Sequence, residues 1–100
     1  MSEFLNEIYE RVRNINEGIS KYEFSKDYLD KSESYYAYLT STNSNESANV
    51  LKNLYKNALK KAQLCEVIAR KYKVRNEAKR NEYLSIAEDT LNEFKRSAIN

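Results

Sequence analysis

Three lysines spaced four residues apart are the feature of this sequence that most clearly suggests binding to another molecule. Lys52, Lys56 and Lys60 recur at the spacing that places side chains on one face of a helix. Like charges at this spacing repel one another by roughly 0.2–0.5 kcal/mol per pair. A phosphate backbone would relieve that repulsion, so the pattern favours an anionic partner. A lysine face that is simply solvated remains the default interpretation of this pattern.

A second group of polar side chains lies earlier in the chain and carries hydroxyl groups. Hydroxyls both donate and accept hydrogen bonds, which suits them to contacts with base edges in the major groove of DNA. Lys21 and Lys26 precede this group and are suited to phosphate contacts. The hydroxyl-bearing candidates are Ser32, Ser34, Tyr35 and Tyr38.

Catalytic chemistry is poorly represented in this chain. The sequence has no histidine, so the usual acid–base group near neutral pH is missing. Its single cysteine, Cys65, falls on an apolar helix face, where a buried and inert thiol is expected. Metal sites built from histidine and cysteine are excluded by number, and no glycine-rich phosphate loop is present. We therefore expect a non-enzymatic protein that needs neither a metal nor a cofactor.

The elements that carry these residues should all be helices. Gly18 is the only glycine, proline is absent, and no run of alternating β-branched residues suggests a strand. One hundred residues predict a single all-α domain, with short helices over residues 1–46 and long helices over residues 47–100. The single cysteine and the lack of a long apolar run predict a cytoplasmic protein that does not interact with membranes.

The net charge of +2 hides an uneven distribution along the chain. Residues 1–50 hold five basic and nine acidic side chains, whereas residues 51–80 hold ten basic and two acidic ones. This segregation indicates an anionic partner for the basic segment 52–80. Residues 20–46, by contrast, hold three basic and five acidic side chains, an unusual balance for a surface that faces DNA.

Helical periodicity and capping residues predict the positions of the first three helices. The first runs from Glu3 to about residue 16. Ser20 and Glu23 form a capping box that begins a helix over residues 21–29. Ser32 is expected to cap a further short helix over residues 33–41, and residues 40–49 have the composition of a polar loop.

Two short helices joined by a tight turn form the layout of a helix-turn-helix. The stretch over residues 20–54 resembles that unit in the Cro and cI-type phage repressors, and Ser25 replaces the small residue, usually alanine, at which the two helices meet. Ser32-Glu33-Ser34-Tyr35 resembles the start of their recognition helix, and Asp30 stands where they prefer glycine. The resemblance implies a small DNA-binding regulator of phage or bacterial origin, in which the helix over residues 33–41 enters the major groove.

The remaining sequence predicts long helices. One should begin near Ser47 and reach about residue 72, followed by a break over residues 73–76 and a last helix to about residue 96. A continuous rod from residue 47 to 96 is the alternative, because neither glycine nor proline forces a turn there. Leu84, Leu91 and Phe94 recur at heptad-like spacing and predict either a hairpin core or a homodimer surface.

A protein-interaction module is the second functional interpretation. Tyr35, Tyr36 and Tyr38 lie close together in the sequence, and tyrosine is enriched in the energetic centres of protein interfaces. On this interpretation the two short helices are a structural unit, and the tyrosines bind a protein partner, as in a phage-type inhibitor or adaptor of a host protein.

Overall fold

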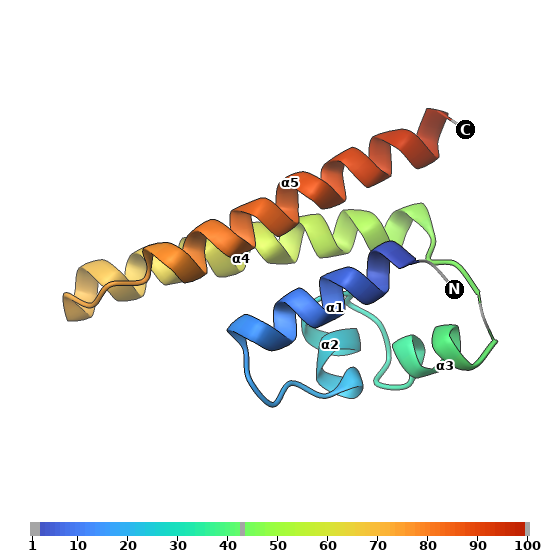
Figure 1. Ribbon diagram of the computed structural model, residues 1–100, viewed down its shortest axis with the longest axis horizontal. Helices are drawn as coiled ribbons and strands as arrows, with labels where there is room; N and C mark the ends of the chain where they lie inside the picture. Colours follow the sequence, from blue (N-terminus) through green and yellow to red (C-terminus); the bar gives the residue numbers. More distant parts are fainter. Residues whose placement is uncertain (1–2, 43, 100) are drawn as a thin grey trace.

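Five helices form the part of the chain that the computed structural model describes, which is residues 3–42 and 44–99 with the side chains of residues 98 and 99 excepted (Figure 1). No strand occurs among these residues, and the all-α prediction is confirmed. The helices are α1 (Glu3–Ile15), α2 (Lys21–Asp27), α3 (Tyr35–Thr42), α4 (Ala48–Tyr72) and α5 (Glu77–Ile99).

The two long helices pack side by side as an antiparallel hairpin, and α1, α2 and α3 lie below one half of it in Figure 1. Lys73 ends α4 in the left-handed conformation, with φ of 54°, and the backbone N–H of Val74 donates to the carbonyl of Ala69 at 3.3 Å. The hairpin alternative is therefore confirmed, and the continuous rod is wrong. The sequence left both open because the residue that reverses the chain here is a lysine, which adopts this conformation only at some energetic cost.

The core lies between the hairpin and the three short helices. On α1, Leu5, Ile8 and Val12 are buried at helical spacing, as expected for its inner face. An aromatic cluster continues this core, with centroids 5.1 Å apart for Tyr9 and Phe24. The Tyr28 hydroxyl shares a 3.1 Å hydrogen bond with the Tyr83 hydroxyl of α5, so the cluster reaches from α1 through α2 to the last helix.

Arg11 fastens α1 to α5 through its whole guanidinium group. Its Nε lies 2.6 Å from Oε1 of Glu82, and its Nη1 lies 2.8 Å from Oδ2 of Asp89. The third nitrogen, Nη2, donates to the hydroxyl of Ser85 at 2.9 Å. Planar guanidinium groups are well suited to such multiple contacts. The first and last helices are thereby held together across more than 70 residues of sequence.

Two short helices differ from their predicted boundaries. The helix expected over residues 21–29 ends at Asp27, and the one expected over residues 33–41 covers Tyr35–Thr42. Ser32 does not cap α3, because its carbonyl accepts the N–H of Tyr35 within a turn and the first helical bond runs from the Tyr38 N–H to Ser34. The predicted loop 40–49 consequently begins later, and its Asn43 lies outside the described residues.

The joint between α2 and α3 depends on one buried serine. Ser25 is 0% exposed, and its hydroxyl donates to the carbonyl of Lys21 at 2.9 Å. The same oxygen accepts the backbone N–H of Tyr36 at 2.9 Å, which satisfies a donor of the first turn of α3 that has no partner within its own helix. A side chain of one helix therefore caps the next, and the small size of serine permits the close approach.

Replacing Phe24 or Leu29 with alanine should lower the free energy of unfolding by roughly 2–5 kcal/mol, because both side chains are fully buried and leave cavities. Chemical denaturation followed by circular dichroism measures this change. Tyr22→Ala is the matched control, since Tyr22 is 58% exposed on the same helix. Two variants as stable as the wild type would contradict the packing described above.

Ser25→Ala should cost about 1–3 kcal/mol of stability, because the buried Tyr36 N–H loses its acceptor. Ser41→Ala removes a hydroxyl that is exposed on α3 and should change stability little. The comparison of the two variants in thermal unfolding isolates the hydrogen bond between the helices. Equal melting temperatures for Ser25→Ala and the wild type would show that this bond does not hold the joint.

Candidate nucleic-acid interface

The candidate surface begins with α2, whose first turn is set by its sequence. The Ser20 hydroxyl accepts the Glu23 N–H at 3.1 Å, and the Glu23 carboxylate accepts the Ser20 N–H at 3.4 Å. This is the predicted capping box, and it is confirmed. After α2, Asp30 adopts φ of 55°, the left-handed conformation in which glycine is strain-free. The chain therefore turns sharply here with an aspartate in place of glycine.

Two asparagines of α4 hold the end of α2 in place. Asn53 Nδ2 donates to the carbonyl of Leu29 at 3.0 Å, and Asn57 Nδ2 donates to the carbonyl of Tyr28 at 2.9 Å. These carbonyls follow the last turn of α2 and would otherwise lack a helical partner. Neither asparagine was identified as functional from the sequence. The available signal was their position inside a long helix, where asparagine has a poor intrinsic propensity.

The outward face of α3 carries the hydroxyl groups that the sequence assigned to DNA. Ser32 and Ser34 are exposed just before the helix, and Tyr38 is 60% exposed on its first turns. Ser41 and Thr42 extend this exposed polar face toward the end of α3. Figure 1 shows α3 at one end of the molecule, below the start of α4. The face is thus accessible from outside the fold.

Tyr35 is placed differently from its neighbours, because it is only partly exposed where α3 meets the start of α4. Burial raises the pKa of its hydroxyl, the nearby Glu46 carboxylate adds to this, and hydrogen bonds with Ser47 oppose it. Lys31 Nζ lies 5.8 Å from the centre of the Tyr35 ring. Tyr35 therefore helps to position α3 and leaves part of its ring at the surface.

Tyr36 does not belong to any binding surface, and its predicted role in a tyrosine contact surface is wrong. The side chain is 1% exposed and packs against Tyr9 and Phe24, with ring centroids 5.0 and 5.2 Å away. Its hydroxyl donates to Oδ1 of Asn6. Burial raises the pKa of Tyr36 to about 12, and Tyr9 and Glu10 contribute in the same direction. Tyr36 and Tyr38 both lie within α3, two residues apart and so on different faces of the helix, and only the packing of Tyr36 against Tyr9 and Phe24 shows which face is buried.

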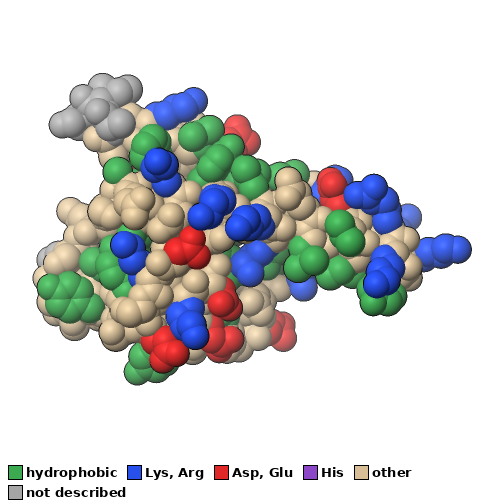
Figure 2. Space-filling model, turned by 180° about the vertical axis from the view of Figure 1, so that it is seen from behind, with side chains coloured by type: hydrophobic (Ala, Val, Ile, Leu, Met, Phe, Trp, Pro, Cys, Tyr) green, Lys and Arg blue, Asp and Glu red, His purple; other side chains and the backbone are tan. Residues whose placement is uncertain are grey.

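Several predicted lysines lie around the α2–α3 turn. Lys56 Nζ is 3.4 Å from Oδ2 of Asp30, which places this part of α4 directly beside the turn. Lys26 Nζ is 3.5 Å from Oε1 of Glu33 across the same turn. Figure 2 shows Lys and Arg side chains gathered over the middle of one face, with acidic side chains beside them. The remaining predicted lysines, Lys21, Lys52 and Lys60, are exposed and make no ion pair within the described residues.

The basic segment 52–80 is not one surface, contrary to the expectation from its charge alone. Its first part, with Lys52, Lys56 and Lys60, lies on the half of α4 that contacts the α2–α3 unit. Its last part forms the end of the hairpin, which Figure 1 places at the opposite end of the molecule from α3. The two parts are far apart because α4 is a helix of 25 residues, and each residue adds about 1.5 Å to its length.

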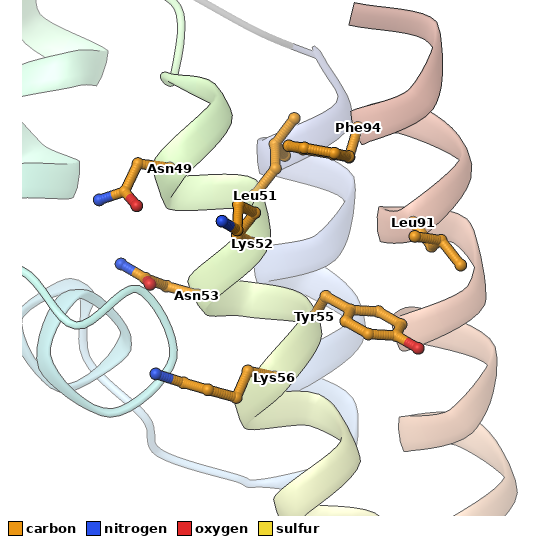
Figure 3. A pocket seen from close by; sticks show the side chains of 8 residues that line it. All are labelled: Asn49, Leu51, Lys52, Asn53, Tyr55, Lys56, Leu91 and Phe94. Atoms are coloured by element: carbon orange, nitrogen blue, oxygen red, sulfur yellow. The ribbon is translucent and has the colours of Figure 1, made fainter. Parts of the chain in front are cut away.

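An apolar groove runs between the start of α4 and the end of α5. Leu51 and Tyr55 face Leu91 and Phe94 across it, and Lys52, Asn53 and Lys56 flank it (Figure 3). Its volume is about 510 Å³. Two of the three residues predicted for a homodimer, Leu91 and Phe94, are partly exposed in this groove, whereas Leu84 is 41% exposed nearer the tip. The hairpin core of α5 is formed instead by Tyr83, Ile86, Ala87 and Thr90.

The cysteine, possible metal ligands and the hydrophobicity of the helices also bear on the function. Cys65 is buried at 5% exposure on the inner side of α4. Among the described residues, no group of histidine, cysteine, aspartate and glutamate side chains is arranged to hold a metal ion. No helix in the described ranges is long and apolar enough to span a membrane.

Comparison with known sequences and structures gives one match. The chain has no significant match among curated proteins or among solved structures. One family profile, described as a family of unknown function (DUF6626), matches residues 5–98 and so covers almost the whole chain. The chain belongs to this family of unknown function, DUF6626.

Proposed function

We propose that this protein is a small DNA-binding regulator that presents the outer face of α3 to the major groove. The observation that carries the proposal is that the hydroxyls of α3 point outward while the joint behind them is closed by buried hydrogen bonds. Ser34 and Tyr38 are exposed, whereas Ser25 beneath them is fully buried and bonded to α3. A short helix held rigidly by the helix before it is the arrangement that helix-turn-helix proteins use to read base edges.

The lysines around this face are suited to the phosphate backbone. Lys21 lies in the first turn of α2, where phosphate oxygens are also attracted by the partial positive charge of a helix N-terminus. Lys52 and Lys60 lie beside the turn on α4 and are exposed. Such contacts fix the position of a protein on the duplex without reading its sequence. Affinity would then come mainly from these lysines, and sequence preference from the hydroxyl face.

The acidic residues near the turn do not rule out this proposal. Asp30 is paired with Lys56, and Glu33 is paired with Lys26. Paired carboxylates contribute less net negative potential than their number in the sequence implies. The unfavourable charge of residues 20–46 is therefore partly offset by α4, a segment that lies outside that stretch.

A protein-interaction module is the alternative, and the groove between α4 and α5 favours it. Apolar side chains that remain partly exposed in a groove are typical of sites that take another helix. Of the predicted tyrosine surface, Tyr38 and the exposed part of Tyr35 are still available for such a partner. An inhibitor or adaptor of a host protein would use these features without any contact to DNA.

The same groove would serve a homodimer, which a regulator of two-fold DNA sites needs. Leu91→Glu should convert such a dimer into a monomer that stays helical, because Leu91 is only partly buried in the monomer. Sedimentation equilibrium and circular dichroism measure the two properties. Glu88→Gln, at an exposed position of the same helix, is a control. A wild-type protein that is already monomeric at high micromolar concentration would reject the dimer.

Gel-shift titration with mixed-sequence duplex tests the proposal directly. Wild-type protein should bind at low salt, and log K should fall linearly with log salt concentration. The double variant Lys52→Ala/Lys60→Ala should reduce this slope by about 2, because each lost phosphate contact removes about 0.9. Lys95→Ala, on an exposed part of α5, should leave the slope unchanged.

Tyr38→Ala separates the two functional classes. In a DNA-binding regulator this variant keeps salt-dependent binding to mixed sequence and loses preference for a selected site. An absence of any shift at about 10–50 µM protein and low salt would overturn the regulator, since even non-specific binders reach this range. The interaction module would be favoured by two results together. The wild type would bind a purified protein partner but no DNA, and Tyr38→Ala would abolish binding of that partner.

A further inference from the structure

We propose that the tip of the α4–α5 hairpin, residues 70–80, is a second and sequence-independent DNA contact, so that one molecule holds two duplex segments. The proposal rests on the DNA-binding function proposed above and extends it. The tip comprises the last turn of α4, the connection over residues 73–76 and the first turn of α5. Nothing in the recognition surface around α3 uses these residues.

The tip is densely and almost uniformly positive. Residues 70–80 hold six basic side chains and a single acidic one, Glu77. Arg80 is paired with Glu66, at 3.1 Å between Nη1 and Oε1. The other five basic side chains make no ion pair within the described part of the chain, and most of their surface faces outward. They are Arg70, Lys71, Lys73, Arg75 and Lys79.

Folding explains only part of this charge. Arg70 and Lys71 lie in the last turn of α4, where cations interact favourably with the partial negative charge of the helix end. Lys79 lies in the first turn of α5, where a cation is unfavourable for the same reason. Lys73 reverses the chain in a left-handed conformation that glycine adopts at no cost. The dipole of α5 therefore disfavours a cation at Lys79, and the turn does not require a lysine at position 73. A phosphate backbone, by contrast, would attract both side chains.

The position of the tip makes it a separate site. The molecule is 44 Å long, and Figure 1 shows the tip at one end of this long axis with α3 toward the other. A duplex bound along the outer face of α3 therefore leaves the tip exposed to a different duplex or to a distant segment of the same one. The tip projects from the rest of the fold at the end of the hairpin (Figure 1), and contacts with a phosphate backbone need no enclosing groove.

Two apolar side chains at the tip make an anionic membrane the competing partner. Tyr72 is 63% exposed and Val74 is 48% exposed. Lys71 Nζ lies 5.5 Å from the centre of the Tyr72 ring, so one of the two apolar side chains already has a cation over it. Five unpaired cations beside two apolar side chains favour a polyanion over insertion into lipid, where apolar area must carry much of the affinity. The experiment below separates the two partners.

The decisive variant is Arg75→Glu/Lys79→Glu. The Arg80 N–H donates to the carbonyl of Asn76, which makes Asn76 the N-cap and Lys79 the third residue of α5. Glutamate is favoured at that position of a helix, so the variant should fold at least as well as the wild type. Lys95→Glu/Arg96→Glu makes the same change in net charge at exposed positions near the far end of α5 and is the matched control, at the cost of the exposed ion pair between Arg96 and Glu93.

The measurement is capture of a fluorescent mixed-sequence duplex by protein bound to a second duplex on beads, at low salt. Wild type and control should capture it, and the tip variant should capture at least tenfold less while still shifting a single duplex in a gel. Its salt slope in solution should also be smaller than that of the wild type when both sites are occupied.

Four results would overturn the proposal. Capture by the tip variant equal to that of the wild type would place the second contact elsewhere, for example in a dimer. A wild type that shifts one duplex and captures no second one would reject the tip and leave the α3 proposal intact. In a third result, the wild type binds vesicles made of equal parts phosphatidylglycerol and phosphatidylcholine, while the tip variant fails to bind them but captures DNA as well as the wild type does. That result would assign the tip to anionic lipid. A wild type that shifts no duplex at all rejects both proposals together.

Discussion

The hydrogen bonds from Asn53 and Asn57 to the end of α2 are the constraint on which the α2–α3 unit depends. They supply donors to the carbonyls of Tyr28 and Leu29 at the point where the chain leaves its helix. Asn57 is 8% exposed, so its bond is protected from competition with water. Because both donors come from one face of α4, they fix the direction of α2 relative to the hairpin. The turn at Asp30 and the position of α3 follow from that direction.

The same packing determines the electrostatics of the proposed DNA surface. Once α4 lies against the turn, Lys56 is brought to Asp30, and the neighbouring lysines of its face lie beside it. The acidic balance of residues 20–46 is therefore a property of the sequence stretch and not of the surface as a whole. The basic segment 52–80 forms two separate positive regions in space, one beside the α2–α3 turn and one at the tip of the hairpin. The two are separate because they lie at opposite ends of the long helix α4 (Figure 1).

Local signals in the sequence predicted the secondary structure well, and tertiary contacts account for the errors. The capping box at Ser20 involves residues three apart, so it was readable directly. The start of α3 was not, because its cap comes from Ser25 in another helix. The buried face of α5 also differs from the one that Leu84, Leu91 and Phe94 indicated, because Tyr83 and Thr90 are buried by their tertiary contacts while Leu84 is 41% exposed. Of the predicted site residues, the burial of Tyr36 is the clear error, and the DNA and dimer functions stay predictions.

The contact of Arg11 with Glu82, Ser85 and Asp89 has a consequence for how the chain reaches its native state. Loops that close over so many residues lose considerable conformational freedom, and contacts of this range slow folding. During synthesis α1 is translated before its partner on α5, with about 70 residues between the two. The nascent chain must therefore keep the inner face of α1 from other partners until α5 has left the ribosome.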